Sequence, residues 1–259
     1  HQTRGRNTTR QRGGDTILTN VCKIIGPPGT GKTTRLIQIV EEELLKGREP
    51  DRIGYFSFTK KATQEAIDRA CSKFKLPRKD LKWFRTLHSL AYQWLGCTHT
   101  DIIQRQDFKD FYNECGVDIS KSIKVDDVAA GEEDSGLSLI DLYRVKNTSL
   151  EHEFQKHGHV VGGLQRLQRI DKLYRMFKKK KGVKDYTDLI TEFNKVDQSP
   201  NLEVLIVDEV QDLKPNEWEM VMIMIKRAQA SYLAGDDDQA IYSWSGADVS
   251  KLIDLDSHL

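Results

Sequence analysis

The sequence contains few cysteines, and their spacing excludes the usual cysteine-based scaffolds. Disulfide frameworks and structural zinc sites depend on closely spaced cysteines or on cysteine–histidine clusters. No two cysteines of this 259-residue chain form a C-x-x-C pair; they are Cys22, Cys71, Cys97 and Cys115. We therefore expect reduced thiols and a cytoplasmic protein.

Long hydrophobic runs and an excess of one charge are also missing. No run approaches the roughly 20 apolar residues that cross a bilayer, and no signal-peptide pattern opens the chain, so we expect no membrane partner. The 40 Lys and Arg residues balance 39 Asp and Glu residues, which leaves a net charge of +1. Any nucleic-acid-binding surface must therefore come from local clustering of positive charge.

One glycine-rich stretch has a specific chemical meaning. Residues 26–33 fit the phosphate-binding pattern G-x-x-x-x-G-K-[ST], between a predicted strand over 21–25 and a predicted helix over 34–45. Glycines let backbone N–H groups turn toward phosphate oxygens, and the helix N-terminus adds partial positive charge. Lys32 is predicted to reach the β- and γ-phosphates of ATP, and the Thr33 hydroxyl to ligate Mg²⁺. The predicted ATP-binding residues are Gly26, Pro27, Pro28, Gly29, Thr30, Gly31, Lys32, Thr33 and Thr34.

Two further predicted strands end in carboxylates. Residues 204–207 form a continuous apolar run followed by Asp208 and Glu209, and residues 230–235 lead to Asp236. Strands that alternate with helices predict a mostly parallel sheet with helices on both faces, and ligands of such sheets lie beyond the carboxyl ends of the strands. Asp208 is therefore predicted to hold Mg²⁺, and Glu209 to activate the attacking water.

Composition divides the chain into four segments. Residues 1–14 contain four arginines and no acid, which favours a basic flexible arm. Residues 15–97 and 186–259 show the α/β pattern, whereas 98–185 are polar and mostly helical, as an inserted subdomain would be. The lysine run 178–181 closes a predicted helix; it favours a solvated helix end, with duplex DNA as an alternative contact.

Five stretches together resemble the UvrD/Rep-like superfamily 1 DNA helicases. Residues 207–212 (VDEVQD) resemble the family's D-E-x-Q-D motif, and residues 235–247 (GDDDQAIYSWSGA) resemble G-D-x-D-Q-[SA]-I-Y-x-[FW]-R-G-A. Residues 57–62 (SFTKKA) are similar to T-F-T-N-K-A, 86–89 (TLHS) to T-[FL]-H-[GS], and 184–190 (KDYTDLI) to D-F-x-D-L-[LI]. They occur in the family's order and cover nearly the whole chain.

This resemblance implies a RecA-like P-loop NTPase motor that is driven by ATP and Mg²⁺ and moves 3′ to 5′ on single-stranded DNA. It implies that Gln239 contacts the γ-phosphate and couples its loss to the DNA site. It further implies that duplex junctions and a second motor domain are partners, with a role in repair, recombination or replication. The residues it implies for DNA contact are Phe58, Thr59, Thr86, His88, Tyr242 and Trp244.

The chain departs from the family pattern at three points. Ser245 stands where the family has Arg, and Gln11 is at a suitable distance for the adenine-reading glutamine but lacks the surrounding pattern. The chain also ends at Leu259, soon after the G-D-x-D-Q motif. We therefore expect an N-terminal portion of a larger helicase that binds nucleotide but hydrolyses it poorly by itself.

Two other functions fit parts of the sequence. A P-loop enzyme acting on a small molecule, such as a kinase, would show DNA-independent turnover. A non-catalytic nucleic-acid-binding or regulatory module would bind DNA without regard to nucleotide.

Overall fold

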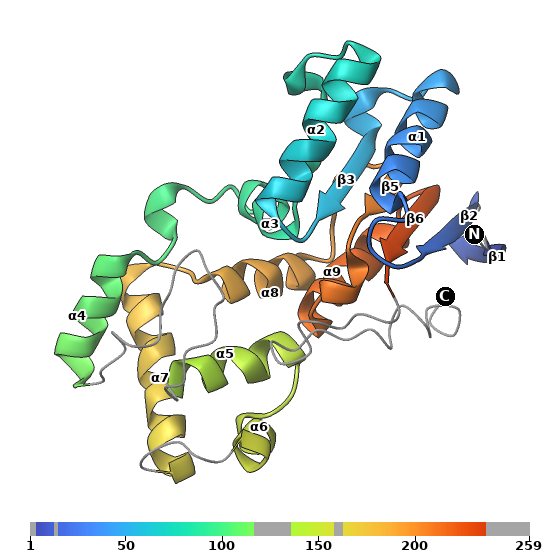
Figure 1. Cartoon of the computed structure of the whole chain (residues 1–259). Coiled ribbons are helices and arrows are strands. Elements are labelled where there is room, and N and C mark those ends of the chain that lie inside the picture. Colours follow the sequence, from blue (N-terminus) through green and yellow to red (C-terminus); the bar gives the residue numbers. More distant parts are fainter. Residues whose placement is uncertain (1–3, 13–14, 117–135, 158–162, 237–259) are drawn as a thin grey trace. The chain divides into compact units, whose positions relative to one another are not determined.

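The computed structural model of the protein describes residues 4–12, 15–116, 136–157 and 163–236 (Figure 1). The chain forms two compact units, which divide between Leu95 and Gly96 and again between Thr191 and Glu192. The first unit holds the sheet and the second, residues 96–191, is helical.

The first unit is built on a sheet with the strand order β1-β2-β6-β5-β3-β4 in the described part of the chain. Strands β2 to β6 run parallel to their neighbours, and β1 pairs with β2 in the antiparallel direction. The predicted α/β fold with a parallel sheet, as in a RecA-like motor domain, is confirmed. The strands are β1 (Arg4–Arg12), β2 (Asp15–Ile25), β3 (Ile53–Ser57), β4 (Phe84–Thr86), β5 (Val204–Val207) and β6 (Ala230–Gly235).

The N-terminal segment differs from the sequence-based prediction. Residues 1–14 were expected to form a flexible arm, but Arg4–Arg12 forms β1, which pairs with β2 from Arg4 opposite Lys23 to Arg12 opposite Asp15. The pairing runs through all nine residues of β1. High charge alone therefore gave the wrong prediction for this segment.

Helices cover both faces of the sheet because its crossovers run in two directions. The connections β2–α1–β3 and β3–α2–β4 cross the sheet one way, and β5–α9–β6 crosses it the other way. Right-handed crossovers then place α1 and α2 on one face and α9 on the opposite face (Figure 1). The helices of this unit are α1 (Lys32–Leu45), α2 (Lys60–Phe74), α3 (Leu87–Trp94) and α9 (Pro215–Ile225).

The core beneath α1 and α2 fixes the direction of the strands' side chains. Leu36 and Val40 of α1 and Ala66 of α2 are completely buried against Tyr55 and Ile206 of the sheet. Burying each large aliphatic side chain contributes about 1.5–3 kcal/mol, so this layer holds β3 and β5 side by side.

The helical unit has its own core. The helices α4 (Arg105–Cys115), α5 (Gly136–Lys146), α6 (Leu150–His157) and α7 (Gly163–Lys181) lie within it, and α8 (Tyr186–Val196) begins there. Phe111 stacks edge-on against Tyr174 and packs against Phe177, with ring centroids 5.5 and 5.3 Å apart. This aromatic contact joins α4 to α7.

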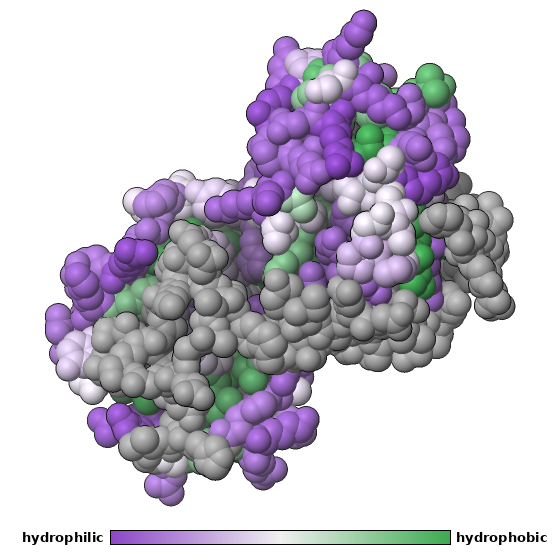
Figure 2. Space-filling view, in the orientation of Figure 1, coloured by the Kyte–Doolittle hydropathy of each residue, from purple (hydrophilic) through white to green (hydrophobic). Residues whose placement is uncertain are grey.

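The described residues on the visible face in Figure 2 are mostly hydrophilic. Figure 2 shows small hydrophobic areas separated by polar residues on the visible face. None of the described helices is long and apolar enough to cross a membrane.

Candidate nucleotide site

The glycine-rich loop joins β2 to α1, as predicted. Gly29 and Gly31 have φ angles of 78° and 86°, and Gly31 is the N-cap residue of α1. Only glycine adopts these left-handed conformations without cost, so the two glycines determine the path of the loop. The Thr30 hydroxyl donates to the Pro27 carbonyl at 2.7 Å and closes the turn.

The Lys32 side chain folds back over this loop. Its ammonium group donates to the carbonyl oxygens of Gly26 at 2.5 Å and Pro27 at 3.2 Å. The Gly26 N–H in turn donates to the Gly235 carbonyl at 3.2 Å, which ties the loop to the end of β6. A positive charge is thus held beside the helix N-terminus, where anions bind favourably.

The strand β5 brings Asp208 to the first turn of α1. The Thr33 hydroxyl donates to Asp208 Oδ2 at 3.2 Å, and the Tyr55 hydroxyl donates to the same oxygen at 2.8 Å. Asp208 is almost completely buried, and burial raises its pKa, whereas the bonds from Tyr55 and Thr33 lower it. The pKa of Tyr55 lies well above 10 because it is buried beside this carboxylate.

Glu209 is directed by an unusual backbone conformation. Its φ of 56° is left-handed, which is uncommon for a residue with a side chain, and it turns the chain sharply after β5. Its N–H donates to Asp208 Oδ1 at 3.0 Å, and its Oε2 accepts from Gln211 Nε2 at 2.7 Å. Adjacent strand residues point to opposite sides, so this turn gives Glu209 a direction that a continued strand would not.

Asp212 is a third carboxyl group that interacts electrostatically with Glu209 and Glu217. Burial and the charges of Glu209 and Glu217 raise its pKa to about 7. The carboxyl group is therefore partly protonated at neutral pH, which reduces the repulsion around Glu209.

Four predicted DNA-contact residues lie where β3 and β4 end. These strands pair in parallel, with Ser57 opposite Thr86, so Phe58 and Thr86 leave the sheet at the same edge. Thr59 and Thr86 are the N-cap residues of α2 and α3, and their hydroxyls accept from Ala62 N–H at 3.1 Å and Ser89 N–H at 3.2 Å. Capping is a structural role of both threonines, separate from the DNA contact that the resemblance implies.

His88 and Phe58 are partly exposed at this edge. His88 Nδ1 lies 3.6 Å from Oε1 of the buried Glu217, so the histidine connects α3 with α9. Phe58 is half-exposed, as a base-stacking ring would have to be.

Of the remaining predicted residues, the structure describes the position of Gln11 alone. Gln11 lies in β1 opposite Thr16, in an antiparallel ladder and not in a loop leading to the phosphate site. Gln239, Tyr242, Trp244 and Ser245 lie outside the residues that the structure describes.

Tyr55 and Gln211 are site residues that the sequence reasoning missed. The tyrosine within the mostly apolar strand β3 was the available signal, because a buried tyrosine normally needs a hydrogen-bond partner. Gln211 is part of the D-E-x-Q-D motif, but its contacts required the structure.

Comparison with known proteins identifies the family. The model of the UvrD/REP helicase N-terminal domain family matches residues 7–259. The chain belongs to this family.

Relatives of this UvrD/REP helicase domain include DNA helicases. The ATP-dependent DNA helicase Rep of Escherichia coli (strain K12) is 26% identical over 254 residues, which cover 92% of this chain and 37% of Rep. The ATP-dependent DNA helicase PcrA of Bacillus subtilis (strain 168) is 28% identical over 246 residues, which cover 88% of the chain and 32% of PcrA. The chain thus spans about a third of the length of the curated relatives it matches, and the predicted family is confirmed.

The family's D-F-x-D-L segment lies in the helical unit, where it forms ion pairs. Asp185 accepts two bonds from the Arg144 guanidinium, at 2.7 and 3.0 Å, and Asp188 accepts a third at 2.5 Å. Lys178, only 5% exposed, donates to both carboxylates. These four residues are called the helical ion cluster below. Burial opposes ionisation, but Arg144 and Lys178 hold the pKa of Asp185 well below its usual range.

The helical ion cluster corrects the interpretation of the lysine run 178–181. A solvated helix end was expected, but Lys178 is buried, Lys180 pairs with Glu114 at 2.9 Å, and Lys181 pairs with Asp107 at 2.9 Å. The spacing of these lysines distributes them over different sides of α7, so the run serves packing as well as the surface.

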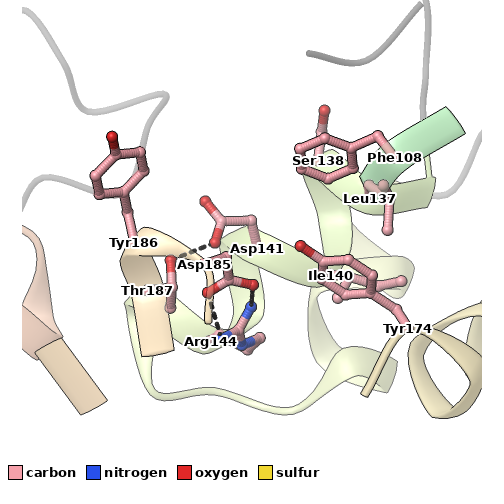
Figure 3. Close-up of a pocket in the computed structure, with 10 residues that line it drawn as sticks. All are labelled: Phe108, Leu137, Ser138, Ile140, Asp141, Arg144, Tyr174, Asp185, Tyr186 and Thr187. Carbon is pink, nitrogen blue, oxygen red and sulfur yellow. Dashed lines mark hydrogen bonds and ion pairs between the residues drawn. The ribbon is translucent and has the colours of Figure 1, made fainter. Parts of the chain in front are cut away.

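A cavity of about 240 Å³ lies beside this cluster (Figure 3). Phe108 and Tyr174 line its apolar side, and the Thr187 hydroxyl donates to Asp141 at its polar side. In Figure 3, Thr187 of α8 bonds Asp141 of α5, and Asp185 bonds Arg144 of α5, so these bonds hold α5 against the start of α8.

Proposed function

We propose that this chain is the ATP-binding motor portion of a DNA-dependent ATPase and 3′–5′ DNA helicase that moves on single-stranded DNA in the cytoplasm. The observation that carries the proposal is the meeting of the Thr33 hydroxyl and the Asp208 carboxylate, 3.2 Å apart, beside a glycine-shaped phosphate loop. These groups come from α1 and from the end of β5, and their convergence is what phosphoryl transfer from ATP requires.

The donor set fits Mg²⁺. Magnesium prefers oxygen ligands and is usually held by one or two protein groups together with substrate phosphates. Thr33 and Asp208 supply a hydroxyl and a buried carboxylate, and burial favours a cation as partner for that carboxylate. When bound, Mg²⁺ would neutralise charge on the β- and γ-phosphates.

Lys32 and Glu209 would perform the chain's own part of the reaction. Lys32 would exchange its bonds to the loop carbonyls for phosphate oxygens and stabilise their charge. Glu209 would accept a proton from the attacking water. Gln239, as the γ-phosphate contact, and Gln11, as the adenine contact, remain part of the proposal on the resemblance alone.

The edge formed by β3 and β4 would hold DNA. Phe58 would stack on bases, a contact worth about 1–3 kcal/mol, while Thr59, Thr86 and His88 would contact the backbone. Tyr242 and Trp244 are proposed as further stacking residues. Single-stranded DNA, duplex junctions and a second motor domain that supplies arginines to the ATP site are the proposed partners.

The deciding experiment measures ATP binding and hydrolysis by the chain, with and without single-stranded DNA, beside Lys32→Ala and Glu209→Gln. We expect ATP binding that Lys32→Ala weakens at least about tenfold, since a charge-assisted phosphate contact is lost. Turnover is expected to be slow, because an arginine supplied from elsewhere is worth orders of magnitude in rate.

Three results would contradict this proposal, and a fourth would contradict the expectation of slow turnover. Failure to bind ATP would remove its basis. DNA-independent turnover of a small acceptor would favour a kinase-like P-loop enzyme. DNA binding that is indifferent to nucleotide would favour a non-catalytic module. DNA-stimulated turnover that is lost in Glu209→Gln would show a motor that is active without a further domain.

A further inference from the structure

We propose that Gln211 is a positioning residue that holds the Glu209 carboxylate and fastens it to the end of β6. The inference rests on the proposed role of Glu209 in activating water. Gln211 belongs to the single turn of 3₁₀-helix, Val210–Asp212, that follows β5, and its side chain is buried.

Both ends of the Gln211 carboxamide are engaged. Its Nε2 donates to Glu209 Oε2 at 2.7 Å, and its Oε1 accepts from the Asp236 N–H at 3.1 Å. A carboxylate can only accept and a backbone N–H can only donate, so these partners fix the orientation of the amide. A glutamate at this position would lack the donor, and a methionine of similar size would lack both groups.

Glu209 needs such a constraint. Its side chain has three rotatable bonds and starts from a left-handed backbone position with a φ of 56°. Within the described residues, Gln211 is the side chain that donates to it. A general base must lie within hydrogen-bond distance of its water, and a displacement of about 1 Å can reduce the rate about 100-fold.

The contact also joins three segments of the site. Asp236 follows β6, whose Gly235 carbonyl accepts from the Gly26 N–H of the phosphate loop at 3.2 Å. Gln239, the proposed γ-phosphate contact, is three residues beyond Asp236 in the sequence. Gln211 therefore connects the base to the strand that precedes this contact, so a shift of β6 would be transmitted to the Glu209 carboxylate.

Single-turnover hydrolysis with the chain in excess over ATP tests this role. We expect Gln211→Met to lower the rate about 10- to 100-fold with the ATP dissociation constant changed less than twofold. The double variant Glu209→Gln/Gln211→Met should be no slower than Glu209→Gln, because the positioning residue acts through the base. Gln38→Met, an exposed position on α1, is the matched control. A rate within twofold of the wild type, or losses that multiply in the double variant, would overturn the proposal.

If the wild type hydrolyses ATP no faster than Glu209→Gln, hydrolysis rates cannot reveal the role of Gln211. A ¹⁵N spectroscopic measurement then tests the hydrogen bond directly. The side-chain N–H₂ resonances of Gln211 are assigned in a ¹⁵N spectrum by their loss in Gln211→Met. Glu209→Gln should shift them more than Lys179→Met does, and should speed their exchange with solvent. Unchanged resonances in Glu209→Gln would contradict the hydrogen bond itself. Wild-type protein that binds no ATP refutes the proposed function, whereas these spectra still test the bridge.

Discussion

Replacing Tyr55 by phenylalanine removes one hydroxyl from beneath the phosphate site and leaves the packing in place. The ring is completely buried and stacks on Phe84 with centroids 5.3 Å apart, so Tyr55→Phe creates no cavity. What is lost is the bond to Asp208 Oδ2 at 2.8 Å. A hydrogen bond to a charged group contributes about 1.5–3 kcal/mol, and we expect a loss of about 2 kcal/mol in the free energy of unfolding at pH 8.

The loss should depend on pH with a definite sign. Burial raises the pKa of Asp208, so the native state binds a proton more tightly than the unfolded state, and stability falls as the pH rises from the ordinary pKa toward the raised one. The hydrogen bond from Tyr55 counteracts this rise, so the pKa of Asp208 should be higher in Tyr55→Phe than in the wild type. The free energy of unfolding should therefore fall more in the variant than in the wild type as the pH increases. At the lower pH, where Asp208 is closer to protonation, the deficit should be smaller than at pH 8, and for a protonated carboxyl group it would approach about 1 kcal/mol, the value for a bond between neutral groups.

Urea unfolding at pH 5 and pH 8 without divalent cations measures both quantities. A loss of 2 kcal/mol lowers the midpoint by about 1 M urea. Tyr92→Phe, a half-exposed position on α3, is the control and should change stability by less than about 0.5 kcal/mol. The reasoning would be refuted if Tyr55→Phe were as stable as the wild type at pH 8, or if its loss of stability were the same at both pH values.

Three further changes test other parts of the structure. Lys178→Met should lower the free energy of unfolding in urea by about 3–5 kcal/mol, because two carboxylates of the helical ion cluster lose a buried partner. The control Lys179→Met, at an exposed position, should change it by less than about 0.5 kcal/mol. Equal effects of the two changes would contradict the cluster's role. Asp212→Asn should raise the free energy of unfolding by about 1–2 kcal/mol at pH 8 and change it little at pH 4. The pKa of Asp212 is about 7, so ionisation of the wild-type carboxyl group above neutral pH costs stability, and partial exposure of the group reduces that cost. A change that is the same at both pH values in thermal unfolding would contradict this. Gly31→Ala should cost about 1 kcal/mol or more at its φ of 86° and weaken ATP binding measured by fluorescence titration; unchanged affinity would show that this loop conformation is dispensable.

Motifs with a fixed spacing were predictable from sequence, and contacts between distant residues were not. The phosphate loop, the acidic ends of β5 and β6 and the α/β class follow from local patterns, because a glycine-rich turn between a strand and a helix has few conformations. The bond from Tyr55 to Asp208 spans 153 positions, and nothing local to either residue indicates the pairing. Burial of Lys178 likewise depends on where Asp185 and Asp188 fold back.

The strand β1 was mispredicted for a related reason. The sequence of this segment shows no alternation of apolar and polar residues, and the segment becomes a strand because its backbone pairs with that of β2. Pairing with a neighbour replaced the hydrophobic alternation on which strand prediction relies.

The two borders of the sheet are protected from self-association in different ways. The β4 border is only three residues long, which offers little to a second chain, whereas β2 is eleven residues long and would be an effective template for strand addition. The antiparallel strand β1, whose sequence includes four arginines, pairs with β2 from Asp15 to Lys23 and so covers nine of its eleven residues. A charged outer strand discourages further stacking of chains, so a version that begins at Asp15 should keep its nucleotide loop but aggregate more readily.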